Sequence, residues 1–182
     1  QDSSLIPKAN LGGPTTPVIG ISWNEVRDYL AWRNQKARKA GEPWLFDLPT
    51  EKEWEKAARG VDARAFPWGN RFDLDVVVGL YSKPMAIFSA PGGFEPCDES
   101  PFGVQDAGGL RQEWTADPYV PDSTAPPLYR VRGGCWAFPR EPLFRSASRF
   151  GQDASVGGGR MGFRLVARLA GAGAGAAAPQ DR

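Results

Sequence analysis

Residues 130–166, RVRGGCWAFPREPLFRSASRFGQDASVGGGRMGFRLV, decide the fold of this chain. Arginine and glycine recur in it as a framework, in Arg132-Gly133-Gly134, in Arg145 and Arg149, and in Gly162-Phe163-Arg164. Chemically unrelated residues stand between these positions. A regular framework that carries irregular insertions indicates a scaffold that supports a binding surface.

Composition limits the classes of function open to the chain. With 182 residues and 41% hydrophobic residues, it can bury one good core. The absence of histidine excludes a Ser-His-Asp triad, a three-histidine metal site and a histidine proton shuttle. Because 22 Lys+Arg balance 21 Asp+Glu, and no apolar run is long enough to span a bilayer, we expect no nucleic-acid partner and no membrane insertion.

The expected organisation is one domain over 18–168, with an extended lead-in over 1–17 and a disordered low-complexity tail over 169–182. Two capping boxes, each a hydroxyl residue followed three positions later by Glu, predict two helices. They are Ser22 with Glu25, for a helix over about 22–40, and Thr50 with Glu53, for a helix that ends at Gly60.

The rest of the chain indicates many loops and a few strands. From Phe66 to Val131 short apolar pieces are broken by Pro and Gly, so loops stabilised by aromatic plugs should outnumber regular elements. Alternating apolar segments predict strands over 130–137, 144–150 and 162–168. The two thiols, Cys97 and Cys135, are too few for a disulfide scaffold and are expected to be small core residues.

Seven motifs follow one another over about 17–166, namely PVIGISWNEVRDYLAW, LPTEKEWEKAARG, FPWGN, SPFGVQDAGGLRQEW, YRVRGGCW, RSASR and GFRLV. In this order they resemble the formylglycine-generating-enzyme superfamily, whose domain is a variant of the C-type lectin fold. That resemblance implies an α+β domain with two helices, many ordered loops and a small, twisted antiparallel sheet.

The resemblance also bears on cofactors. The aerobic formylglycine-generating enzymes hold copper with two cysteines shortly after an RGGS motif, but the corresponding stretch here, 137–144, contains no thiol. The related sulfoxide synthases bind iron through three histidines, which this chain lacks. The family segment DMAGNVWEW places an Asn near a calcium ion, whereas DAGGLRQEW has Leu110 there. We therefore expect no catalytic residues, no cofactor and no obligatory metal, with Glu113 paired to a framework arginine and Asp106 holding a turn.

The residues between the framework positions form the candidate ligand-binding surface, over about 135–159. Large aromatic groups beside small polar ones resemble a paratope, and the pattern is similar to the variable proteins of diversity-generating retroelements, which use this fold to display a randomised C-terminal patch. The phenylalanines have an equally good explanation as plugs of a small core. The set comprises Cys135, Trp136, Ala137, Phe138, Arg140, Leu143, Phe144, Ser148, Phe150, Gln152, Asp153 and Ser155.

These observations favour a non-catalytic display domain that binds a protein or other surface ligand. The principal alternative is a degenerate formylglycine-generating-enzyme-like domain of a bacterial kinase or another signalling protein. A hydrolase or oxidase that uses carboxylates is a third possibility. The framework arginines could form a basic patch for nucleic acid, but we expect them to pair with acidic residues elsewhere, such as Asp106, Glu113 and Asp117.

Overall fold

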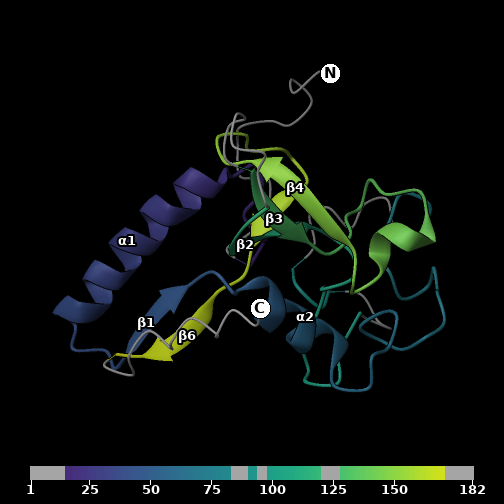
Figure 1. The fold of residues 1–182 in the computed structure, drawn as a ribbon, viewed down its shortest axis with the longest axis horizontal. Coiled ribbons are helices and arrows are strands. Elements are labelled where there is room, and N and C mark those ends of the chain that lie inside the picture. Colours follow the sequence, from purple (N-terminus) through teal and green to yellow (C-terminus); the bar gives the residue numbers. More distant parts are fainter. Residues whose placement is uncertain (1–14, 83–89, 94–97, 120–127, 171–182) are drawn as a thin grey trace, which may run out of the picture.

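The computed structural model of the chain describes residues 15–82, 90–93, 98–119 and 128–170. Most of the lead-in and tail expected at the two ends lies outside these ranges, as does Cys97. Within them, two α-helices, a four-stranded sheet and a two-stranded sheet form an α+β fold, and loops make up much of the remainder (Figure 1).

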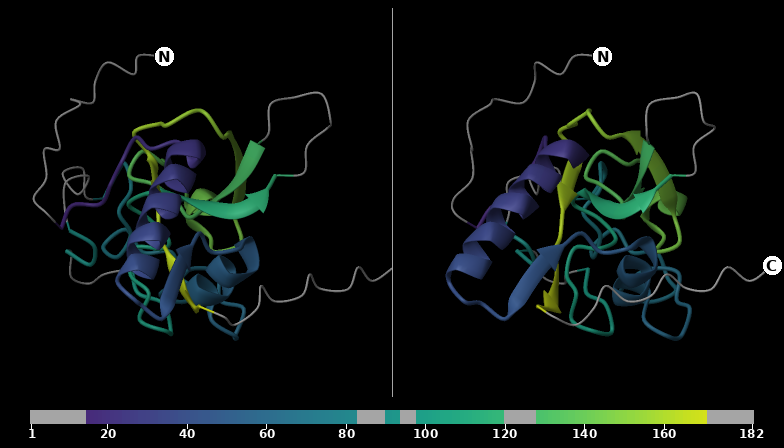
Figure 2. Two further views of the ribbon diagram at one scale, coloured as in Figure 1. Left: turned by 90° about the vertical axis from the view of Figure 1, so that its left-hand side faces the viewer. Right: turned by 60° about the vertical axis from the view of Figure 1, so that its left-hand side comes forward.

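The first helix, α1 (Trp23–Lys39), lies where the sequence predicts it. The carboxylate of Glu25 accepts a hydrogen bond from Ser22 N at 2.8 Å and the Ser22 hydroxyl accepts from Glu25 N, so both halves of the capping box are formed. Val26, Leu30 and Ala37 are its buried residues. In Figure 2, α1 runs along one side of the molecule, beside the two-stranded sheet.

The second helix, α2 (Glu51–Arg59), is also confirmed, with Thr50 as its N-cap and Gly60 as its C-cap. Gly60 has φ 74°, a left-handed conformation that glycine adopts without steric cost. Two hydrogen bonds from Arg168, at 2.7 and 2.8 Å, are the main cause that lowers the pKa of Glu53 to about 2. The Glu53 carboxylate therefore joins the start of α2 to the C-terminal strand.

The four-stranded sheet has the order β4-β3-β2-β5. Its strands are β2 (Gln112–Pro118), β3 (Leu128–Arg132), β4 (Arg149–Asp153) and β5 (Met161–Phe163). The pairs of β3 with β2 and with β4 are antiparallel, but β5 pairs with β2 in parallel. The sheet, predicted to be antiparallel, is thus mixed. The chain crosses from β4 at one edge of the sheet to β5 at the other edge, and β5 runs in the same direction as β2.

A second, two-stranded sheet joins β1 (Trp44–Asp47) to β6 (Val166–Leu169) in antiparallel register. The single strand predicted over 162–168 is therefore divided between β5 and β6, with Arg164 at the break. Strand β6 continues through Leu169, one residue past the expected domain end, and Ala170 N donates to Pro43 O at 2.7 Å.

The other two predicted strands are also corrected. The strand expected over 130–137 ends at Arg132, since Gly133 has φ 78° and turns the chain. Most of the strand expected over 144–150 is not extended: a 3₁₀ helix, η3 (Glu141–Phe144), precedes a turn, and β4 begins only at Arg149. Proline in η3 lacks an N–H for a sheet ladder, and the η3 turn directs Phe144 into the core.

The main core lies between α1 and the four-stranded sheet, where Val26 and Leu30 pack with Trp114, Val131 and Met161. A second apolar cluster lies under the loops. It contains Phe66, Val77 and Phe144, with Trp68 and Phe72 packed against it, and confirms the expected aromatic plugs. Between Gly60 and Arg111, the described residues form turns and two isolated bridges. No helix in the described part of the chain is long and apolar enough to cross a membrane.

Candidate functional site

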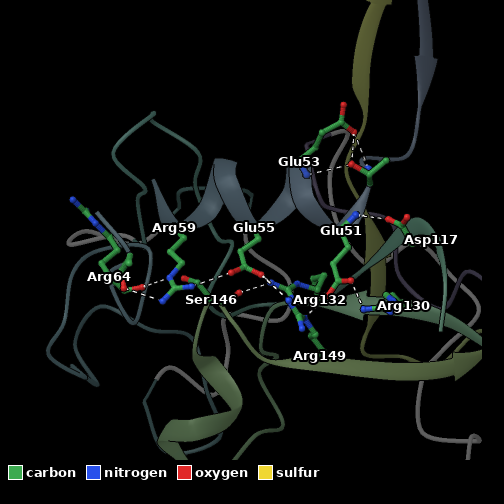
Figure 3. Close-up of polar contacts among 12 residues, drawn as sticks. Glu51, Glu53, Glu55, Arg59, Arg64, Asp117, Arg130, Arg132, Ser146 and Arg149 are labelled. Atoms are coloured by element: carbon green, nitrogen blue, oxygen red, sulfur yellow. Dashed lines mark hydrogen bonds and ion pairs between the residues drawn. The ribbon is translucent and has the colours of Figure 1, made fainter. Parts of the chain in front are cut away.

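A charged cluster joins α2 to the four-stranded sheet. Figure 3 shows Glu51 and Glu55 pointing from one side of α2 toward Arg130 and Arg132 of β3 and Arg149 of β4. The Arg132 side chain has no solvent exposure. It donates to Glu51 Oε1 at 3.0 Å, to Glu55 Oε2 at 2.7 Å and to Ser146 O at 2.6 Å. Buried charges of this kind are tolerated only when paired and hydrogen-bonded.

A cleft of about 580 Å³ opens over this cluster, lined by Glu51, Glu55, Lys52, Lys56, Arg59, Arg130 and Arg149 among others. The carboxylates of Glu51 and Glu55 both form ion pairs with arginines. Burial by itself would raise the pKa of Glu55, but the positive charge of Arg132 and its hydrogen-bond donors hold that pKa below its ordinary value. A carboxylate kept ionised in this way is a poor general acid at neutral pH.

The acidic partners of the framework arginines differ in part from those expected. Arg164 pairs with Glu113, with Nη2 donating to Oε1 at 2.6 Å, as the sequence predicts. The indole of Trp54 also donates to Glu113, at 2.6 Å. Arg132 and Arg149, however, pair with Glu51 and Glu55. The signal that could have found these two carboxylates is their one-turn spacing on α2, on the same face as the buried Trp54 and Ala58.

The segment that resembles the family's calcium region has an apolar side chain in place of the expected oxygen ligand. Leu110 is 4% exposed, has φ 60° and packs with Val78 and Trp136. Asp106 has φ 59° and accepts a hydrogen bond from Gly92 N at 2.6 Å, so it holds a turn as expected. Among the described residues, no group of three acidic, Cys or His side chains lies together in a way that could hold a metal.

The one cysteine that the structure describes, Cys135, does not offer the pair of thiols that holds copper in the family. Cys135 has no exposed surface, and burial raises the pKa of its thiol. Copper(I) prefers paired thiolates, whereas stretch 137–144 contributes none and the chain has only two cysteines. The residues present therefore do not fit a copper centre.

Two members of the candidate ligand-binding surface belong to the core and are withdrawn from it. Cys135 is completely buried, and Phe144 is 2% exposed within the cluster of Phe66 and Val77. A ligand cannot reach either side chain without local unfolding. The other ten residues of the set are exposed or partly exposed.

Three of the ten residues line one hollow of about 200 Å³, which we call the aromatic pocket. Phe138 comes from the loop after Gly134, while Phe150 and Gln152 come from β4. The two rings have centroids 5.5 Å apart and are tilted by 48°. The complete lining is Gln112, Val131, Phe138, Phe150, Gly151, Gln152, Arg160 and Met161, so each strand of the four-stranded sheet contributes.

The remaining surface residues do not line the aromatic pocket. Trp136 packs with Val78 and Leu110, next to Ala137. Ser148 donates to Pro142 O at 2.6 Å, close to the η3 turn that also contains Leu143. Asp153 and Ser155 form a hydrogen-bonded turn at the other end of β4, which lies away from η3 in Figure 1. The predicted single patch is therefore a pocket with separate flanking segments.

Sequence reasoning missed five of the pocket residues, namely Gln112, Val131, Gly151, Arg160 and Met161. One signal was available for the first of them. Aligned with the family segment DMAGNVWEW, DAGGLRQEW has Gln112 in place of the first tryptophan. A smaller, polar side chain at that strand position leaves room beside the two phenylalanines.

Comparison with known proteins supports the resemblance. The family model for the sulfatase-modifying factor enzyme 1-like domain matches residues 7–169. The mouse (Mus musculus) protein named inactive C-alpha-formylglycine-generating enzyme 2 is 31% identical over 162 residues, which cover 82% of this chain and 48% of that protein. Serine/threonine-protein kinase pkn1 of Chlamydia caviae is 29% identical over 165 residues, which cover 82% of this chain and 24% of the kinase. A formylglycine-generating enzyme of Thermomonospora curvata is 30% identical over 128 residues, 68% of this chain and 32% of the enzyme. The chain thus spans about half the length of the first of these relatives and less of the other two.

Two solved structures share the fold. PvdO from Pseudomonas aeruginosa superimposes with a TM-score of 0.66 at 28% identity, over 87% of this chain and 64% of that one. Variable protein 1 of Treponema denticola superimposes with a TM-score of 0.64 at 18% identity, over 91% of this chain and 76% of that one, a likeness of fold alone. The expected C-type-lectin-like fold is confirmed.

Proposed function

The chain belongs to the sulfatase-modifying factor enzyme 1-like family, and on that premise we propose that it is a non-catalytic ligand-binding domain of the family. One observation carries this proposal. The segment that supplies copper thiolates in the enzymes, 137–144 here, supplies Phe138 to the aromatic pocket and contains no cysteine. An apolar wall formed by this segment suits recognition and offers no redox chemistry.

Other features support the same proposal. Glu51, Glu55 and Glu113 are engaged by arginines, which disfavours the hydrolase or oxidase that would use free carboxylates. A relative that is 31% identical over 162 aligned residues is itself named inactive. Relatives of this chain include a formylglycine-generating enzyme, so the non-catalytic role that we propose follows from the donor atoms of this chain and not from family membership.

The ligand surface that we propose comprises the aromatic pocket and its flanking segments. A pair of tilted phenylalanine rings beside amide and charged groups is typical of residues that dominate binding energy in interfaces. We propose that the partner is a protein or another macromolecular surface. The residues of this chain would form a variable patch that contacts it, as in the variable proteins of diversity-generating retroelements. The surface comprises Trp136, Ala137, Phe138, Arg140, Leu143, Ser148, Phe150, Gln152, Asp153 and Ser155.

The alternative that this domain is part of a signalling protein is favoured by one specific observation. Kinase pkn1 matches most of this chain although the chain spans only 24% of the kinase, so a domain of this kind occurs within a longer signalling protein. The gene separates the two possibilities. A template repeat and a reverse-transcriptase gene beside the coding sequence would support diversified display, and a kinase domain in the same reading frame would support the signalling role.

The absence of catalysis is tested directly with the purified protein, a cysteine-containing peptide, copper(I) and oxygen. We expect no stoichiometric copper by elemental analysis after desalting and no mass change of the peptide, while an active formylglycine-generating enzyme run in parallel converts it. Tightly held copper together with peptide oxidation would refute the proposal.

A further inference from the structure

The side chain of Gln112 brings an amide group to the aromatic pocket. It is 7% exposed, and its amide group makes no hydrogen bond to any described residue, although its backbone N donates to Arg160 O at 2.9 Å. The aromatic pocket is the open space that it lines. The Gln112 amide is not among the fully buried, unpartnered polar groups of the described residues, so it opens to the pocket, where it can donate to or accept from a ligand.

Arg160 gives the same pocket a positive charge. It is exposed, lines the pocket, and forms no ion pair with a carboxylate of the described residues. None of the eight lining residues is acidic. Arg160 is thus the one charged residue of the pocket lining, which favours a negatively charged group there.

The other walls are apolar and set the size of the occupant. The tilted rings of Phe138 and Phe150 pack against each other, with centroids 5.5 Å apart, and Val131 and Met161 come from the main core. A hollow of about 200 Å³ has room for one side chain and its nearest neighbours, and is small for a folded element. The occupant must combine a short apolar stem with a terminal polar group.

We propose that the aromatic pocket binds a glutamate side chain of a protein partner. This inference rests on the proposed ligand-binding function and names the chemistry recognised there. The carboxylate pairs with Arg160 and accepts from the Gln112 amide, while the methylene groups pack against the apolar wall that the two phenylalanine rings form. A lysine or arginine side chain is repelled by Arg160, an apolar side chain leaves Gln112 unsatisfied, and an amide leaves the Arg160 charge unpaired.

The test uses three blocked amino acids as probes, N-acetyl-glutamate methylamide and the corresponding glutamine and lysine compounds. Each is titrated into the nitrogen-15-labelled full chain at pH 7, and resonances of the Gln112 side-chain amide and of Gly151 are followed. We expect saturable shifts in the millimolar range with the glutamate probe, at least fivefold weaker binding of the glutamine probe, and no saturation with the lysine probe. No saturable shift with the glutamate probe, or equal affinity for the glutamine probe, overturns the proposal.

Variants separate recognition from folding. Arg160→Ala and Gln112→Leu should each weaken the glutamate probe about tenfold or more while the rest of the spectrum stays native, and Arg160→Lys should keep part of the affinity. Arg38→Ala is the matched control, because Arg38 is an exposed arginine of α1 outside both the pocket and the proposed ligand surface, and it should leave the titration unchanged. An unchanged affinity in Arg160→Ala contradicts the proposal.

Failure of this inference is distinguishable from failure of the proposed function. Oxidation of the cysteine peptide in the copper assay would defeat the non-catalytic function without any bearing on the probe titration. Conversely, if the protein does not oxidise the peptide and the glutamate probe does not bind, only the proposal of a glutamate ligand is contradicted.

Discussion

Arg132 of β3 donates from Nη2 to Glu55 Oε2 of α2 at 2.7 Å, and the arginine side chain has no contact with solvent. This contact fastens α2 to the sheet that carries the aromatic pocket. Because a charge left alone in the interior is costly, Arg132→Ala should lower the free energy of unfolding by about 3–5 kcal/mol, measured by urea denaturation. Arg168→Ala removes the half-exposed pair with Glu53 and should cost less than about 1 kcal/mol. Equal losses in the two variants would show that the Arg132 network contributes little to stability.

The buried carboxyl group of Asp98 should make the free energy of unfolding depend on pH between about pH 4 and pH 7. Complete burial is the main cause that raises the pKa of Asp98 to about 7. The hydrogen bonds that its carboxylate accepts from Gly109 N and Gly108 N act in the opposite direction and lower this pKa. Because the folded-state pKa lies above the unfolded one, the stabilising contribution is fully present below the unfolded pKa and is lost as pH rises through 7. Asp98→Asn should flatten the stability profile over this window in denaturant melts at several pH values. A profile as steep as that of the wild type would assign the dependence to other groups.

The two phenylalanines on either side of the core boundary should respond differently to truncation. Phe144 is buried, so Phe144→Ala should cost about 3–5 kcal/mol by leaving a cavity. Phe138 is only partly buried, and Phe138→Ala should cost about 1–2 kcal/mol because less apolar surface is involved. Thermal or urea unfolding of both variants measures this order, and a larger loss for Phe138 would place it in the core and outside the ligand surface.

Gly134 should not tolerate a side chain. A Cβ atom there would lie 2.3 Å from Gly108 O and 2.5 Å from a Phe144 ring carbon, so Gly134→Ala should cost about 1–3 kcal/mol through overpacking. Gly158 has only the Met161 side chain within contact range, at 3.7 Å, and Gly158→Ala should stay within about 0.5 kcal/mol of the wild type. Comparable unfolding midpoints for the two variants would contradict the close approach of the 108 and 134 backbones.

Local sequence signals determined the helices and much of the framework. The capping boxes at Ser22 and Thr50 lie within four residues of the helix starts that they define, so no tertiary contact was needed to recognise them. The order of the motifs identified the family. The absence of histidine and of a cysteine pair near 137–144 follows from the residue types alone, and it excludes the metal sites that the family's enzymes use.

Only the tertiary structure decided which residues meet. Alternation in 162–168 could not indicate that Arg164 separates two sheets, because a strand's partner is chosen by distant segments. Burial divided Phe144 from Phe138 although both look alike in sequence. The aromatic pocket joins Gln112 to Arg160 across 48 positions through the parallel pairing of β2 and β5, a contact that no local pattern encodes. The sequence thus determined which residue types the chain offers and which metal ligands it lacks, while the packing of remote strands decided which side chains line the aromatic pocket.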